Sequence, residues 1–153
     1  MTATAVSVTI DELPDLEGAT FGPSSWREIT QDEVNLYAKV SGDDNPIHLD
    51  AEFAASTPFG TRIAHGLLTL SLVVPHMREI FKVTGVGMGI NYGMNRVRFP
   101  APVPVGARVR VHGHIKSVTD IGGGWQVEVP VTFEIEDVEK PACVAELVLR
   151  YYK

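Results

Sequence analysis

The stretch that decides the fold is GLLTLSLVVPHMREIF, residues 66–81. Apolar side chains recur through it with almost no polar face, which is typical of a helix buried in the middle of a domain. Pro75 has no N–H and crowds the carbonyl four residues earlier, so we expect it to kink this helix or to end its regular part. The sequence therefore predicts one long central helix.

Downstream of this helix the apolar residues recur with a period of two. Alternating segments cover residues 87–99, 107–118, 124–135 and 142–152, and the breaks between them read PAPVPVG, TDIGGG and DVEKP. Such a series predicts an antiparallel meander. One helix against four or five strands indicates an α+β fold with a curved antiparallel sheet wrapped around the central helix. The hotdog fold has this outline, and so do other helix-on-sheet arrangements.

Upstream of the helix the chain looks less regular. Residues 1–23 are expected to form a loosely structured arm with at most one short turn of helix, and residues 26–29 a short strand. Thr30 and Glu33 have the spacing of a capping box, and the apolar stripe that follows predicts a short amphipathic helix that ends near Gly42.

Composition limits the class of protein. A chain of 153 residues and 16.7 kDa, with 44% hydrophobic and 21% charged residues, has the character of one soluble domain spanning residues 1–153. A net charge of −6 and a pI near 5.3 argue against nucleic acid or an anionic membrane as the main partner. The single Cys143 and the absence of Lys and Arg from the first ten residues predict a cytosolic protein without a secretory signal. The longest apolar stretch is far shorter than the ~20 residues that a membrane span needs.

The most unusual segment is SGDDNPIHLD, residues 41–50, within a long excursion from residue 42 to residue 65. Asp43 and His48 are five residues apart, and Pro46 between them restricts the backbone, so the two side chains can converge. A carboxylate beside an imidazole can hold one water molecule and move its protons. That is the chemistry needed to add water across a polarised double bond.

Plainer interpretations of these residues stay open. Asp and Asn are routine turn and capping residues, and Asp44 and Asp50 are expected to face solvent or to cap the loop. His48 and Asp50 make a poor metal ligand set without a second His or Cys, and the pair His112 and His114 lacks a third ligand. We therefore predict no metal. The glycines at 122–124 predict a hairpin turn instead of a nucleotide loop, so no cofactor is expected.

Several motifs together resemble a known family. The segment at 41–50, followed by Phe-Ala-Ala at 53–55 and Ala-His-Gly at 64–66, resembles the signature of the MaoC-like dehydratases, also called R-specific or type 2 enoyl-CoA hydratases. INYGMNRVRFPAPVPVGARVRV, residues 90–111, and the ending KPACVAELVLRYY are similar to small single-hotdog members. The resemblance covers roughly residues 24–153 and implies a hotdog fold.

The resemblance also implies roles for particular residues. Asp43 and His48 match the catalytic pair, Asn45 matches the Asn that supports them, and Gly66 matches the glycine whose N–H binds the thioester carbonyl. The Gly66 assignment has a physical basis as well, since the first N–H groups of a helix lack intrahelical partners and lie at the positive end of its dipole. One departure is Val74, where some members carry a serine.

Other residues have weaker assignments. His65 is expected to position the loop, and Arg62 and Arg96, with Arg98, are candidates for the phosphates of a CoA or carrier-protein arm. Four apolar residues are expected either to line an acyl tunnel or to belong to the core: Leu67, Leu70, Met88 and Met94.

The predicted activity is reversible syn hydration of a trans-2-enoyl thioester to an R-3-hydroxyacyl thioester. The enzyme would be a hydro-lyase without a cofactor of its own, because CoA or phosphopantetheine enters as part of the substrate. The resemblance further implies a homodimer with a continuous sheet. Two alternatives remain: a thioesterase that directs water at C1, and a catalytically silent acyl-binding subunit of a heteromeric dehydratase.

Overall fold

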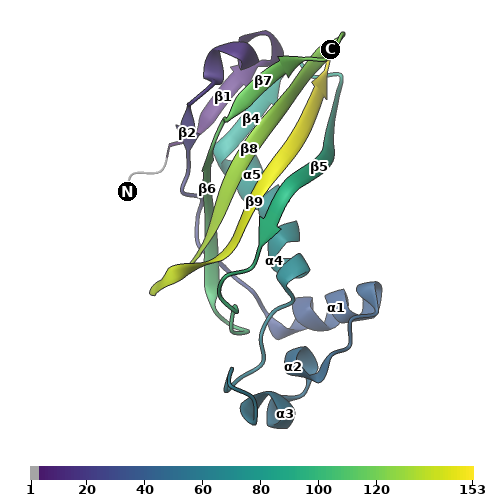
Figure 1. Ribbon diagram of the computed structural model, residues 1–153, viewed down its shortest axis with the longest axis vertical. Coiled ribbons are helices and arrows are strands. Elements are labelled where there is room, and N and C mark those ends of the chain that lie inside the picture. The colour runs from purple at the N-terminus through teal and green to yellow at the C-terminus, as the bar shows by residue number, and fades with distance from the viewer. Residues whose placement is uncertain (1–3) are drawn as a thin grey trace.

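The computed structural model describes residues 4–153 (Figure 1). Its helices are α1 (Gln31–Ser41), α2 (Pro46–Leu49), α3 (Ala51–Ala55), α4 (Gly66–Ser71) and α5 (Val73–Ile80). Its strands are β1 (Val6–Thr9), β2 (Thr20–Phe21), β3 (Arg27–Glu28), β4 (Phe81–Thr84), β5 (Met88–Arg98), β6 (Arg108–His114), β7 (Ser117–Asp120), β8 (Gly124–Ile135) and β9 (Val138–Tyr152). None of the helices in this described part of the chain combines the length and apolarity required to cross a bilayer.

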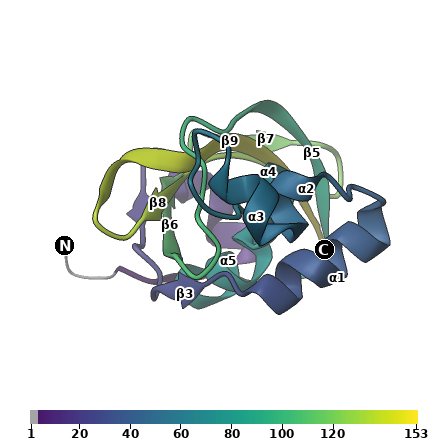
Figure 2. The same ribbon diagram turned by 90° about the horizontal axis from the view of Figure 1, so that it is seen from below.

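The main sheet is antiparallel and has the strand order β2-β6-β8-β9-β5, with β3 also paired to β6 and β7 to β8. The strands arch over α4 and α5 (Figure 2). Alternation along β8 and β9 directs one set of side chains, including Val127, Val129 and Leu147, into the core. The predicted α+β architecture of a curved sheet around a central helix is therefore confirmed.

The central helix consists of two pieces. It breaks at Leu72, which separates α4 from α5. The cause is Pro75, which has no N–H to donate to the carbonyl of Ser71 and whose ring crowds that carbonyl. The expected effect of Pro75 is confirmed. Regular helix ends at Ile80, because Phe81 already belongs to β4, which pairs in parallel with β1.

The predicted meander is wrong at one strand. β6, β8 and β9 follow one another in the sheet, but β5 pairs with β9 at the opposite side from β6. The connection at 99–107 contains three prolines, which favour an extended chain over a tight turn. It crosses the end of the sheet (Figure 1) and pairs with residues 62–64 through Ala64 N–H to Val103 O (2.8 Å) and Val105 N–H to Arg62 O (2.9 Å).

The N-terminal arm is more ordered than the sequence suggests. Beyond residues 1–3, which lie outside the described part of the chain, it forms β1, a 3-10 helix over Ile10–Leu16, and β2. Ile10, Leu13 and Phe21 are buried in the core. The arm also ends β6, since Ile115 exchanges backbone hydrogen bonds with residues 18 and 19, so the segment expected at 107–118 is two strands.

Helices α1, α2 and α3 gather at one end of the sheet (Figures 1 and 2). The capping box of Thr30 and Glu33 is present at the start of α1, and Gly42 ends that helix with a φ of 77°, a value that glycine adopts without strain. The turn of helix expected at 51–55 is α3, and Asp50 caps it by accepting the N–H groups of Glu52 and Phe53. The sequence did not predict α2.

One of the buried histidines, His76, lies in the core on α5. His76 is 3% exposed, its Nδ1 is 2.8 Å from Ser24 Oγ, and its Nε2 has no hydrogen-bond partner among the described residues. Burial lowers the pKa of His76 from its ordinary 6.5, and Arg27 lowers it further, whereas Glu79 opposes the shift. The folded protein therefore holds this ring neutral.

We expect the free energy of unfolding to fall as the pH drops below 6.5, the ordinary pKa of His76. Below that pH the unfolded chain takes up a proton that the folded chain refuses, and the loss continues until the pH reaches the lowered pKa. Urea titrations between about pH 7.5 and pH 5.5, a range above the titration of most carboxylates, measure the slope. His76→Gln should make the slope shallower, and part should remain because the pKa of His48 is lowered as well. His114→Gln, at an exposed position, is the control variant. An unchanged slope in His76→Gln contradicts this account.

Candidate active site

The imidazole of His48 is fixed by the short helix α2. Asn45 caps that helix by accepting the N–H of Ile47 on its side-chain oxygen (3.2 Å), and Pro46 occupies the first helical position, where its missing N–H costs nothing. His48 is 7% exposed and its Nδ1 lies 2.7 Å from the carbonyl oxygen of Ile63. Because a carbonyl can only accept, Nδ1 carries the proton and Nε2 of the neutral ring has a free lone pair.

Two further hydrogen bonds hold α2 in place. The Ile63 N–H donates to Ile47 O (3.2 Å), so this segment is joined to α2 at two points. On the other side, Gln31 Nε2 donates to the backbone oxygen of His48 (3.0 Å) and thereby links the start of α1 to α2. The ring of His48 is thus positioned by three separate segments of the chain.

The backbone of Asp43 is held on both sides, and its side chain is exposed. After Gly42 redirects the chain, the Asp43 N–H donates to Ser41 Oγ (3.2 Å) and the Asp43 carbonyl oxygen accepts from His65 Nε2 (2.9 Å). Asp43 itself is exposed to solvent. His65 thus contacts the loop through the backbone of Asp43.

His65 also contacts His48 directly. The two rings stack with centroids 3.8 Å apart, and the ring of Tyr37 packs on His65 at 4.8 Å. One side-chain polar atom from each of Asp43, His48 and His65 lies within 4.8 Å of the other two. The predicted pair of carboxylate and imidazole is therefore brought together, with a second imidazole that the sequence did not assign to the pair.

Electrostatics keep His48 neutral. Burial lowers the pKa of His48 from 6.5, and the nearby His65 acts in the same direction, while the hydrogen bond to Ile63 and the charge of Asp43 oppose the shift. The net effect is a ring that keeps its Nε2 lone pair at neutral pH. Such a group can accept a proton from water.

The arrangement suits one bound water. Two polar atoms up to 4.8 Å apart can both reach a water oxygen, since each hydrogen bond spans about 2.8 Å. Two imidazoles and a carboxylate are also ligands that Zn²⁺ accepts. The rings of His48 and His65, however, are only 31° from parallel, so their in-plane lone pairs do not converge well on one ion. The donor set therefore fits a water better than a tetrahedral metal.

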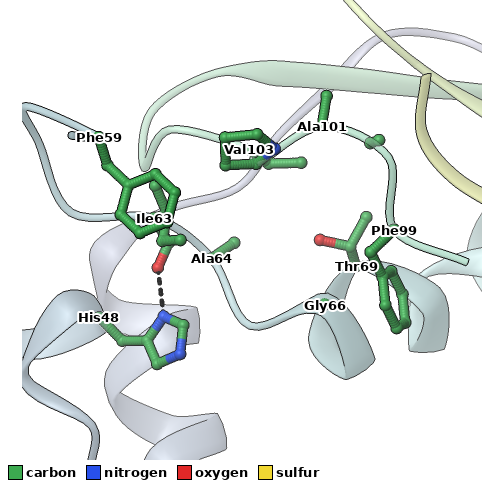
Figure 3. A pocket seen from close by; sticks show the side chains of 11 residues that line it. His48, Phe59, Ile63, Ala64, Gly66, Thr69, Phe99, Ala101 and Val103 are labelled. Carbon is green, nitrogen blue, oxygen red and sulfur yellow. Dashed lines mark hydrogen bonds between the residues drawn. The ribbon is translucent and has the colours of Figure 1, made fainter. Parts of the chain in front are cut away.

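A cavity of about 290 Å³ opens beside His48 (Figure 3). It is lined by His48, Phe59, Ile63, Ala64, Gly66, Thr69, Phe99, Ala101, Pro102, Val103 and Ala142. The Pro-rich connection that crosses the sheet supplies one wall, and the segment from α2 to α4 supplies the other. Asp43 lies outside this lining, so His48 is the member of the pair that faces the cavity.

Gly66 is the first residue of α4, directly after His65. Its N–H is one of the helix-terminal donors that have no intrahelical acceptor, and Gly66 lines the same cavity as His48. A Cβ added at Gly66 would lie 3.0 Å from the ring of Phe99, so the cavity is closed tightly over the backbone here. Because α4 has six residues, the direct N–H contact should matter more than the dipole of the helix.

Other residues selected from the sequence lie outside the cavity. Arg62 is half-buried and contributes its backbone to the pairing with Val105, while Arg96 and Arg98 line a separate hollow on the outside of the sheet. The expected acyl tunnel is not formed by the residues we selected: Leu70 is core, and Leu67, Met88 and Met94 are exposed. Exposed Asp44 and the cap Asp50 match their plain assignments.

The pair on the predicted strand also has an ordinary environment. His112 lies 3.4 Å from Glu134, which also binds Arg110. Within residues 4–153, the three-residue group at Asp43 is the one cluster of His, Cys and acidic side chains close enough to share an ion.

Sequence reasoning missed Phe59, Phe99 and Thr69 as cavity residues. The two Phe side chains are roughly two-fifths exposed, and nothing in the local pattern separates them from ordinary loop anchors. Thr69 interrupts the apolar helix at 66–81, and a polar residue on an otherwise apolar face was the available signal.

A curved antiparallel sheet around a central helix, with an imidazole and a helix-initial glycine facing one cavity, defines a hotdog-type protein with a candidate acid–base site. A family model described as MaoC like domain matches residues 13–136. The chain therefore belongs to the MaoC-like dehydratase family.

Relatives and solved structures agree with this membership. The chain is 49% identical over 144 residues to 3-hydroxyacyl-thioester dehydratase Z of Mycobacterium tuberculosis, covering 94% of this chain and 95% of that protein. It resembles the structure of the R-hydratase PhaJ1 from Pseudomonas aeruginosa, with a TM-score of 0.71, 26% identity, and coverage of 90% and 82%. A likeness in fold alone extends to the 3R-hydroxyacyl-ACP dehydratase complex HadBC of M. tuberculosis, with a TM-score of 0.69, 19% identity, and coverage of 89% and 97%.

The hydrogen bond between His65 and the Asp43 carbonyl gives a testable prediction. His65→Phe keeps an aromatic ring between Tyr37 and His48 but removes the donor, so we expect the free energy of unfolding to fall by about 1 kcal/mol. Backbone amides of residues 43–45 should exchange with solvent faster, as measured by hydrogen–deuterium exchange. Tyr37→Phe, which keeps the ring, is the matched control. Unchanged exchange at 43–45 in His65→Phe would show that the loop is held by other contacts.

Proposed function

We propose that this protein catalyses the reversible R-specific hydration of trans-2-enoyl thioesters to R-3-hydroxyacyl thioesters. Asp43 and His48 activate the water, Asn45 fixes the helix that carries His48, and the Gly66 N–H polarises the C1 carbonyl. The observation that carries the proposal is the placement of the neutral, cavity-facing His48 within water-bridging distance of the Asp43 carboxylate. The names of the relatives support the same reaction class.

The geometry favours His48 as the base. Its Nδ1–H is engaged by Ile63 O, so Nε2 is the atom free to accept a proton from the water. The water oxygen bonds to C3, the π electrons of C2=C3 move toward C1, and negative charge develops on the C1 oxygen beside the Gly66 N–H. His48 then returns the proton to C2. Asp43 orients the water and stabilises the transient imidazolium.

The binding of the CoA or carrier-protein arm of the substrate is a broader proposal. The cavity accepts the acyl group, and the thioester carbonyl lies at Gly66, so the phosphates of CoA or of a carrier-protein arm lie well outside it. Arg62 is the nearer candidate for them, because its neighbours Ile63 and Ala64 line the cavity. Arg96 stands on another face of the sheet and would serve only if the arm, or a second subunit, brought a phosphate there.

We also propose that the protein is a homodimer joined through β5. This strand pairs on one side with β9 and lies at the edge of the sheet, and its side chains are exposed along its length. Met88, Ile90, Tyr92 and Met94 present apolar surface there. An apolar edge strand of 11 residues is a surface that proteins normally cover.

The two alternatives are weaker but distinguishable. A thioesterase would direct the same water at C1 and release free thiol, and hydration without thiol release excludes it. A silent subunit of a heteromeric dehydratase, as the likeness in fold to HadBC allows, would be inactive alone. An inactive subunit has no need of the proposed catalytic residues, so the presence of Asp43, Asn45 and His48 argues against this alternative.

The proposal includes a cytosolic setting and no resident cofactor. Cys143 is buried, and burial raises the pKa of its thiol to about 11, so it is poorly suited to redox or disulfide chemistry. The reaction itself transfers only water and needs no electron carrier.

The pair is tested by Asp43→Asn and His48→Asn assayed on crotonyl-CoA with purified protein alone. Each variant should lose at least ~100-fold in rate, because each removes a participant in proton transfer. Loss of absorbance of the enoyl thioester measures hydration, and a thiol reagent measures release of CoA in the same sample. Thermal unfolding checks that the variants remain folded. A variant that keeps near wild-type hydration would remove that residue from the mechanism.

The dimer is tested by Ile90→Asp, which places a charge on the edge strand. We expect analytical ultracentrifugation to report a dimer for the wild type and a shift toward monomer for this variant, because a charge buried in an interface without a partner is costly. Val138→Asp is the matched control, since Val138 is also an exposed apolar strand residue but lies away from β5. A wild type that sediments as a monomer contradicts the proposed dimer.

A further inference from the structure

One polar side chain in the cavity has no role in the mechanism described so far. Of the cavity-lining side chains, His48 and Thr69 are the polar ones, and the rest are apolar apart from glycine. Thr69 is 1% exposed. Its side-chain oxygen points into the cavity, in the space between Gly66, Ala64 and Val103 (Figure 3). A valine would fill the same volume without placing a hydroxyl against apolar walls.

The hydroxyl of Thr69 is weakly engaged. Its oxygen lies 3.3 Å from the backbone oxygen of His65, a long contact for an O–H donor. That carbonyl already accepts the backbone N–H of Thr69 at 3.0 Å. The hydroxyl can therefore turn toward a ligand without leaving the His65 carbonyl unpaired, and turning costs a small part of one hydrogen bond.

Thr69 is also correctly placed relative to Gly66. Residues three apart share one face of a helix, and Gly66 and Thr69 both lie on α4. Both residues line the same cavity, so one acceptor can meet the Gly66 N–H and the Thr69 hydroxyl together.

We propose that Thr69 is a second catalytic hydrogen-bond donor, whose hydroxyl binds the C1 oxygen of the acyl thioester beside the Gly66 N–H. This inference rests on the proposed hydratase function. As water adds to C3, negative charge moves onto the C1 oxygen, and both donors stabilise it; Thr69 keeps its own proton throughout. The second donor compensates for the shortness of α4, which limits what the helix dipole can contribute.

The direct test is the carbonyl stretching frequency of bound butyryl-CoA labelled with ¹³C at C1. This saturated thioester cannot be hydrated, so the measurement does not depend on turnover. Hydrogen bonds to the oxygen lower the frequency, and difference infrared spectroscopy on the whole protein detects the change. We expect Thr69→Val to lose part of the wild-type shift, and Thr69→Ser, which keeps a hydroxyl, to recover most of it relative to the valine variant.

Turnover of crotonyl-CoA is measured on the same proteins. Thr69→Val should lower kcat by roughly 10- to 100-fold with a smaller change in KM, because the donor acts mainly on developing charge. Ser71→Ala is the matched control: its hydroxyl also bonds back to a helix carbonyl, Leu68 O, but it lies outside the cavity. We expect it to match the wild type in frequency and in kcat.

The outcomes separate this inference from the proposed function. If Thr69→Val keeps the wild-type frequency and kcat and loses only stability, the hydroxyl serves the helix and the inference is overturned. If the wild type polarises bound butyryl-CoA through Thr69 but does not hydrate crotonyl-CoA, the contact stands and the hydratase function fails. If the wild type does not bind the thioester at all, both are wrong.

Discussion

The hydrogen bond from His48 Nδ1 to the carbonyl oxygen of Ile63 decides what this site can do. A carbonyl only accepts, so the bond fixes which ring nitrogen holds the proton and leaves the other as a base. The rest of the end formed by α1, α2 and α3 serves this bond. Asn45 and Pro46 start the helix that carries the ring, and Gln31 anchors its far end. Without that bond the imidazole is free to rotate or to change tautomer. Nε2 would then no longer be held as the proton acceptor near Asp43.

The site balances two opposing electrostatic effects. Burial of His48 lowers its pKa, whereas the hydrogen bond to Ile63 O and, to a smaller extent, the charge of Asp43 raise it. A base that stays neutral before reaction but is stabilised once protonated needs both. In this site, partial burial, the Ile63 carbonyl and the Asp43 carboxylate act together on the ring.

Local signals in the sequence were sufficient for the local features. Alternation identified the long strands, Pro75 located the break in the central helix, and the spacing of Asp43 and His48 predicted two side chains that lie close together. Features that depend on distant contacts were not predictable. The position of β5 follows from the pairing of the crossover at 99–107 with residues 62–64. The place of His65 beside Gly66 suggested that it positions the loop, but its partner is a backbone carbonyl, which no residue type predicts. Thr69 interrupts an apolar face in the sequence, but only the cavity shows what its hydroxyl faces.

The Pro-rich crossover at 99–107, which made the predicted strand order wrong, also supplies a separate part of the site. The residues proposed to transfer protons come from the segment between α1 and α4, whereas Phe99, Ala101, Pro102 and Val103 form the opposite wall from a separate part of the chain. Selectivity for the acyl group and chemical reactivity are thus encoded in two stretches that touch across an open space. Exchange of the crossover between members of the family is a modular way to redirect such an enzyme to other chain lengths while the proton-transfer apparatus stays intact.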